Sequence, residues 1–202
     1  MKPKQIRGVP LHKSGGFHDT ESTKRFDQTM ISLKFEILKN RFYTINKWKD
    51  YCGEAFAAFK LYDSIGMPVD RKPQKGDFIR INIPGPGEIE AKGFDWVEVT
   101  DICFYQDTVS ESILMTCRPS QNPVGKKNTH TAHFYSSKAS STFIISKGTD
   151  YLKAAIYGRN ESPNFNASFI DIIRNMVIAA GGMLGIAKIQ WKQLTEALLD
   201  FD

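Results

Sequence analysis

The alternation of apolar and polar residues predicts where the regular structure of the chain begins. From residue 31, apolar residues alternate with Ser32, Lys34 and Glu36, which is the period of two of a half-buried strand. The apolar members are Ile31, Leu33, Phe35 and Ile37. Residues 1–29 before them are polar and show no period, so we expect an extended or disordered N-terminal arm.

The apolar spacing then changes to three and four residues, which is typical of a helix with one buried face. This amphipathic stretch covers residues 46–64, with Asn46 as the expected N-cap and Gly66 as the expected stop. Its apolar positions are Trp48, Tyr51, Cys52, Ala55, Phe56, Phe59 and Tyr62. A proline-rich loop follows the predicted helix.

Strand-like segments then follow one another at hairpin spacing, separated by turn residues such as Pro84-Gly85-Pro86-Gly87. Consecutive strands joined by short turns predict an antiparallel sheet. The segments are 76–84, 94–104, 112–118, 130–136, 142–147 and 151–157.

The last part of the chain predicts a long helix. Ser168 and Asp171 have the spacing of a capping box, and apolar residues then recur every three or four positions from Ile170 to Leu198. The pattern continues through Gly181-Gly182, although each glycine costs a helix about 1 kcal/mol relative to alanine. A kink at this glycine pair therefore stays an alternative to one unbroken helix.

The middle of this helix is apolar on all sides and rich in small residues, so another element or a ligand must cover it. Three interpretations are open. Small side chains such as Gly182 leave a cavity for an apolar ligand, or they let the helix lie close to the sheet. In the third, Gly181 and Gly185 form a helix–helix contact in a homodimer.

Together the elements predict an α+β domain over residues 30–202, in which a curved antiparallel sheet of about seven strands grips a long C-terminal helix. This order of elements over residues 31–199 resembles the helix-grip fold of the START-like (SRPBCC) superfamily. The segments GDFIRINIPGPG, GFDW, AHFY and GRNESPN also resemble those of uncharacterised bacterial proteins. The superfamily resemblance implies a cavity for lipids, sterols, polyketides or other apolar ligands, and some members are cyclases or hydratases.

One expected feature departs from that superfamily. Its members usually carry two short helices after the first strand, whereas the pattern here predicts one long helix and a proline-rich loop. A lipocalin-like or nuclear-transport-factor-like cone therefore stays an alternative fold.

Composition and charge exclude several classes of protein. With 41% hydrophobic and 24% charged residues, the chain is neither disordered, collagen-like nor a disulfide scaffold. Residues 1–29 hold six basic and three acidic residues, which is +3 of the net charge of +5, so the nearly balanced remainder gives no strong nucleic-acid signal. The longest uncharged apolar stretch, 175–187, is shorter than the ~20 residues of a membrane span. Three scattered cysteines without a CxxC pair predict reduced thiols and a cytoplasmic protein.

Polar residues on the predicted strands are the candidates for ligand binding. His133 and Tyr135 share one strand face, where they either project into a cavity or form a surface or satisfied core pair. Arg80, Trp96 and Arg118 lie opposite the most aliphatic strand faces. They would hold an acidic head group if their face lines the cavity, and would be solvent residues if it is the convex side.

No motif for a metal or cofactor is visible, so we expect neither. His130 and His133 would fall on opposite faces of a strand, which does not suit a metal site. No phosphate-binding glycine loop and no GxSxG motif occurs.

These observations favour non-catalytic binding of a small apolar or amphipathic ligand between the sheet and the last helix. The alternative is an interaction or structural subunit that uses the apolar helix and the basic arm as contact surfaces. A cyclase- or hydratase-like enzyme comes third, because the spacing of residues reveals no acid–base pair.

Overall fold

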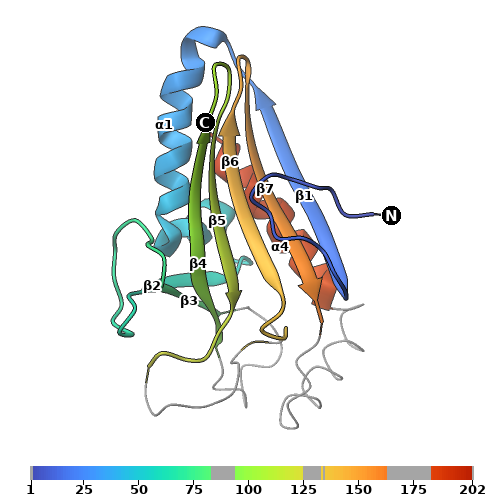
Figure 1. Cartoon of the computed structure of the whole chain (residues 1–202). Coiled ribbons are helices and arrows are strands. Elements are labelled where there is room, and N and C mark those ends of the chain that lie inside the picture. The colour runs from blue at the N-terminus through green and yellow to red at the C-terminus, as the bar shows by residue number, and fades with distance from the viewer. Residues whose placement is uncertain (1, 83–93, 125–132, 134, 163–182, 202) are drawn as a thin grey trace.

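The computed structural model describes residues 2–82, 94–124, 133, 135–162 and 183–201, and a sheet with the strand order β1-β7-β6-β5-β4-β3-β2 dominates this part of the chain. All neighbouring strands are antiparallel (Figure 1). The strands are β1 (Gly16–Arg25), β2 (Ala58–Tyr62), β3 (Phe78–Asn82), β4 (Asp95–Gln106), β5 (Glu111–Pro119), β6 (Ser140–Lys147) and β7 (Tyr151–Glu161).

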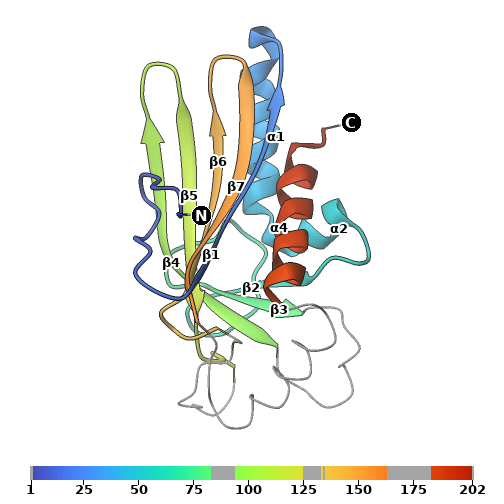
Figure 2. The ribbon, with the colours of Figure 1, turned by 90° about the vertical axis from the view of Figure 1, so that its right-hand side faces the viewer.

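The helices cover one face of this sheet, which we call the helix face; the opposite side is the outer face (Figure 2). Helix α1 (Gln28–Tyr43) packs against β6 and β7, and α4 (Met183–Leu199) packs against β1 and β7. Between α1 and β2 lie a 3₁₀ turn, η1 (Ile45–Lys47), and the short helix α2 (Trp48–Cys52). The sheet and its C-terminal helix confirm the predicted α+β, helix-grip-like fold class.

Tightly packed side chains fill the space between the sheet, α1 and the C-terminal turns of α4. The Trp48 ring is fully buried, lies 5.3 Å from the rings of both Phe59 and Phe143, and donates its Nε1–H to the carbonyl of Arg41. Leu194 is also fully buried in the same cluster. These contacts leave no room for a ligand inside this cluster.

The predicted first strand is in fact helix α1. Its buried residues are Ile31, Phe35, Leu38 and Phe42, at helical spacing. Leu33 and Ile37 are 58% and 38% exposed. Ile31 and Phe35 fit both periods because residues four apart share a face in a helix and in a strand. The positions beyond residue 37 decide between them, because Leu38 and Phe42 are buried at helical spacing.

The predicted helix over residues 46–64 was also wrong over most of its length. Helix α2 ends at Cys52, and Gly53 follows in the left-handed region with a φ of 94°. Asn46 caps no helix; its Oδ1 accepts the backbone N–H of Leu61 in β2, which joins η1 to the sheet. Gly66 lies in a turn after β2, again at positive φ, rather than at a helix end.

The predicted arm contains a strand of the sheet, which corrects the expectation of no regular structure over residues 1–29. Strand β1 pairs with β7 along its whole length. Its helix face carries His18, Thr20 and Ser22 instead of aliphatic residues, so apolar alternation could not indicate it. Ile6 and Val9 of the remaining arm pack on the outer face against a small buried cluster.

Because β1 is the first strand, two helices, α1 and α2, lie between the first and second strands. The expected departure from the superfamily, one long helix in place of two short ones, is therefore not found. The predicted strands 76–84, 94–104, 112–118, 142–147 and 151–157 correspond to β3 to β7, and α4 corresponds to the end of the predicted last helix. The capping box, Gly181-Gly182 and most of segment 130–136 lie outside the described residues.

Candidate functional site

A buried histidine–glutamate pair lies on the helix face where β1 and β7 meet. His18 Nδ1 is 2.8 Å from Glu161 Oε1, and the two side chains are only 3% and 2% exposed. The other polar atoms of the pair, His18 Nε2 and Glu161 Oε2, are also buried, and neither has a hydrogen-bond partner among the described residues. A buried polar atom without a partner costs about 1–3 kcal/mol, so such atoms are expected where a further group binds.

The backbone of both strands creates the room for this pair. The ladder has a register shift between Gly16 and His18, opposite the end of β7, where Asn160 adopts a positive φ of 57°. Gly158 pairs with His18, and a Cβ there would collide with both the His18 ring and the Glu161 carboxylate. Glycine at residue 158 is therefore required for the two side chains to meet.

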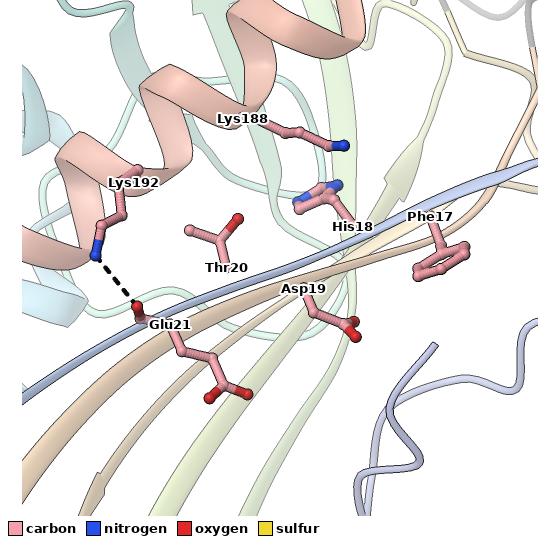
Figure 3. A pocket seen from close by; sticks show the side chains of 7 residues that line it. All are labelled: Phe17, His18, Asp19, Thr20, Glu21, Lys188 and Lys192. Atoms are coloured by element: carbon pink, nitrogen blue, oxygen red, sulfur yellow. Dashed lines mark hydrogen bonds between the residues drawn. The ribbon is translucent and has the colours of Figure 1, made fainter. Parts of the chain in front are cut away.

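Helix α4 forms the opposite wall of a pocket beside the pair (Figure 3). The pocket has a volume of about 550 Å³ and is lined by Phe17, His18, Asp19, Thr20, Glu21, Lys188 and Lys192. The Lys192 ammonium is held by the Glu21 carbonyl at 3.3 Å and by Ser22 Oγ at 3.0 Å. Lys188 is exposed and makes no hydrogen bond or ion pair with any residue that the structure describes.

The carboxylates that line the pocket point to the other side of β1. Asp19 Oδ1 lies 2.7 Å from the buried guanidinium of Arg159. Glu21 accepts the Tyr157 hydroxyl at 2.5 Å and pairs with Lys4 and Lys153 at 2.8 and 3.0 Å. Burial opposes ionisation of Glu21, yet these hydrogen bonds lower its pKa from 4.5 to about 2. The negative charge of β1 is thus neutralised on the outer face. On α4, Glu196 Oε1 lies 3.1 Å from the Lys192 ammonium, so among the described residues Lys188 supplies the positive charge that has no ion pair.

The predicted candidates His133 and Tyr135 lie close to the same end of β7. The backbone N–H of Ser136 donates to the carbonyl of Ser162 at 2.8 Å. The Tyr135 N–H donates to His133 Nδ1, and the two rings stack 5.8 Å apart. Burial lowers the pKa of His133 to about 3, so it is neutral near pH 7. Burial and the charge of Glu161 raise the pKa of Tyr135, so its hydroxyl stays protonated.

The candidates Arg80, Trp96 and Arg118 instead lie on the outer face. The Arg80 guanidinium covers the ring of Phe94 at 4.1 Å, and the ring of Trp96 meets that of Tyr62 at 4.9 Å. Arg118 is exposed across from Glu98. This is the placement in which these residues were expected to face solvent. Arg118 does so, whereas Trp96 is buried at 3% exposure. A ligand role for them stays an untested prediction. Gly182 lies outside the described residues.

Three further features of the described residues concern metal ligands, thiols and membrane-spanning helices. These residues contain no group of three or more His, Cys, Asp or Glu side chains arranged to hold a metal ion. Cys52, Cys103 and Cys117 are free thiols, and burial raises the pKa of Cys52 to about 12. No helix in the described ranges is both long and apolar enough to cross a membrane.

Sequence reasoning missed His18, Glu161, Lys188 and Lys192. His18 and Glu161 are 143 residues apart, so no motif spacing could join them. The one sequence signal was the polar pattern HDTES, which alternates threonine and serine with acidic residues and fits a strand that is polar on both faces.

Comparison with known proteins shows similarity in structure alone. No protein-family model matches the chain, and no curated protein matches its sequence. A hypothetical protein from Helicobacter pylori is similar in structure over 98% of this chain and 99% of its own, with a TM-score of 0.52 at 7% identity. Norcoclaurine synthase from Thalictrum flavum covers 96% of this chain and 99% of its own, with a TM-score of 0.40 at 8% identity. A protein from Staphylococcus epidermidis covers 94% and 93%, with a TM-score of 0.41 at 12% identity.

Proposed function

We propose that this chain is a small-ligand-binding protein of the START-like helix-grip type, with its site between β1, the end of β7 and α4. The observation that carries the proposal is a pocket with His18 in its wall, where His18 is paired with the buried Glu161 and its Nε2 has no hydrogen-bond partner among the described residues. A volume of about 550 Å³ falls within the range of roughly 300–1,000 Å³ that is usual for small-molecule sites. The order of strands and helices supports the superfamily assignment.

The charges around the pocket favour an amphipathic anion. Asp19 and Glu21 are engaged on the outer face, whereas Lys188 is without an ion pair in the described part of the chain. An ammonium at the rim of a pocket holds a carboxylate or sulfonate by charge and hydrogen bonding. The aliphatic stems of the two lysines supply apolar contact for the body of the ligand.

Titration with 1-anilinonaphthalene-8-sulfonate, an aromatic sulfonate that fluoresces when bound, tests this function. We expect saturable binding that Lys188→Glu weakens at least about tenfold, because it reverses the charge beside the anion. Lys47→Glu is the matched control, since Lys47 is exposed on η1 and distant from the pocket in the fold. Absence of binding, or equal weakening by both variants, would contradict the proposal.

A second candidate function rests on an exposed apolar stripe along α1. Met30, Leu33 and Ile37 are 41%, 58% and 38% exposed, and their spacing places them on one side of the helix. This favours an interaction subunit, although through α1 rather than through the arm, whose Ile6 and Val9 pack on the sheet. Sedimentation that shows a dimer in the wild type and a monomer in Leu33→Asp would support it; a monomer at every concentration would contradict it.

A further inference from the structure

We infer that the groove between β1 and α4 binds an extended peptide that ends in a free carboxylate, and that the peptide adds to the sheet as a further strand beside β1. This inference rests on the proposed function and names the chemical class of its anionic ligand. It follows from the free edge of β1, the length of the groove and the position of Lys188.

Strand β1 forms one edge of the described sheet, because its strand partner there is β7 alone. Just beyond β1, the N–H of Phe26 donates to the carbonyl of Asp150 at 2.9 Å, so the even-numbered residues of β1 direct their backbone groups toward β7. The backbone groups of Asp19, Glu21 and Thr23 therefore point to the free edge. Their N–H groups donate to no other group in the ranges that the structure describes.

The carbonyl of Glu21 shows that this edge accepts hydrogen bonds from within the groove. It accepts the Lys192 ammonium at 3.3 Å, across the space between β1 and α4 (Figure 3). In strand addition a backbone N–H of the peptide occupies this position. Lys192 can yield it, because Ser22 Oγ and Glu196 Oε1 remain as its partners at 3.0 and 3.1 Å.

The groove is long enough for several residues of an added strand. The pocket of about 550 Å³ beside His18 and a second one of about 560 Å³ share Glu21 and Lys192. Together they follow β1 from residue 17 to residue 24. An extended chain advances about 3.4 Å per residue, so a peptide of about six residues matches this length of β1.

The charges along the groove give the peptide a direction. Lys188 lines the first pocket and not the second, and its side chain points with that of His18 into the space between β1 and α4 (Figure 3). The acidic residues Glu196 and Asp200 line the second pocket and not the first. A terminal carboxylate is therefore favoured at the Lys188 end, near the start of β1, so the peptide runs antiparallel to β1.

Calorimetric titration with an acetylated hexapeptide of alternating valine and threonine tests the inference, since β-branched residues favour extended strands. We expect the peptide with a free carboxylate to bind at least about tenfold tighter than the same peptide with a C-terminal amide. Lys188→Gln should lower this ratio to about one and leave the affinity for the amide unchanged. Equal binding of the two peptides by the wild type would overturn the inference.

Two N-methylated forms of the free acid test the addition of a strand. One form carries methyl groups on its first, third and fifth amides, and the other on its second, fourth and sixth. An added strand bonds to β1 through one of its edges, so one form should bind at least about tenfold more weakly than the other. Equal affinities of the two forms would contradict pairing through the backbone.

Substitutions at Thr23 test the free edge from the side of the protein. Thr23 is exposed, and its N–H faces the groove rather than β7. Thr23→Pro removes that N–H without removing a bond to β7, so it should weaken the free acid at least about tenfold. Thr23→Ala retains the N–H and is the matched control. Wild-type affinity in Thr23→Pro would overturn the inference.

The outcomes separate this inference from the proposed function. Binding of the naphthalene sulfonate without binding of either peptide overturns the inference alone, whereas failure of all these probes overturns both. A wild-type dimer in sedimentation that Thr23→Pro dissociates would assign the edge to a second copy of the chain, and this result would also overturn the inference.

Discussion

Glu21 shows how a single side chain on β1 stabilises the outer layer of the molecule. Its carboxylate joins Lys4 of the arm, Lys153 of β7 and the Tyr157 hydroxyl, while its backbone carbonyl accepts from Lys192 of α4. One residue thus links the N-terminal arm, two strands and the C-terminal helix.

Acid should reduce the stability that the Glu21 carboxylate contributes to the fold. The folded protein holds the pKa of Glu21 at about 2, compared with 4.5 for a free side chain. The carboxylate therefore stabilises the fold fully above about pH 4.5, and this stabilisation is lost as the pH falls from 4.5 toward 2. Urea unfolding across this range should show a smaller loss of stability in Glu21→Gln than in the wild type. Glu54→Gln, at a side chain 99% exposed, should retain the wild-type pH dependence, and an identical slope in all three proteins would contradict the assignment.

Asn160 fixes the N-terminal arm through its side chain. Its Oδ1 accepts the backbone N–H groups of Lys13 and Ser14 at 2.6 and 3.2 Å, and its Nδ2 donates to the Leu11 carbonyl at 3.1 Å. Its own backbone lies in the left-handed region, where glycine is free of strain and alanine is not.

Two substitutions at residue 160 should separate these roles. Asn160→Gly and Asn160→Ala both remove the arm contacts, so trypsin should cleave after Lys13 faster than in the wild type. Asn160→Ala should also be less stable than Asn160→Gly by about 1 kcal/mol, because only alanine is strained at this φ. Wild-type cleavage rates in both variants would show that the side chain does not hold the arm.

At the scale of elements, α1 shows how a short pattern misleads. Ile31, Leu33, Phe35 and Ile37 alternate as a strand would, yet the helix buries only Ile31 and Phe35 of the four. Strands β3 to β7 could be predicted because aliphatic residues alternate over their helix faces. Strand β1 could not, because its hydroxyl and charged side chains find partners in α4, β7 and the arm that no local pattern reveals.

A pair of identical substitutions in α1 tests its helical packing. Leu38 is fully buried and Leu33 is 58% exposed. Leu38→Ala should lower the free energy of unfolding by about 2–5 kcal/mol, since it leaves a cavity. Leu33→Ala should change it by less than about 0.5 kcal/mol. A larger loss at Leu33 than at Leu38 in urea unfolding would favour a strand over residues 31–37.

At the scale of the whole molecule, the sheet order brings the two ends of the chain together at the candidate site. Strand β1 lies beside β7, so His18 meets Glu161, and α4 then returns along both strands with Lys188 and Lys192. The sequence predicted the sheet and its C-terminal helix from local periods. It could not predict the site, because the site depends on pairing between the first and last strands.

The most direct test of this account is a ¹H–¹⁵N NMR titration of the whole chain with 1-anilinonaphthalene-8-sulfonate. Binding in the proposed pocket predicts the largest backbone shifts in residues 17–22, 158–161 and 188–192, with residues 30–37 of α1 unaffected. Shifts concentrated on the apolar stripe of α1, or no saturable shift at all, would contradict a ligand site between β1 and α4.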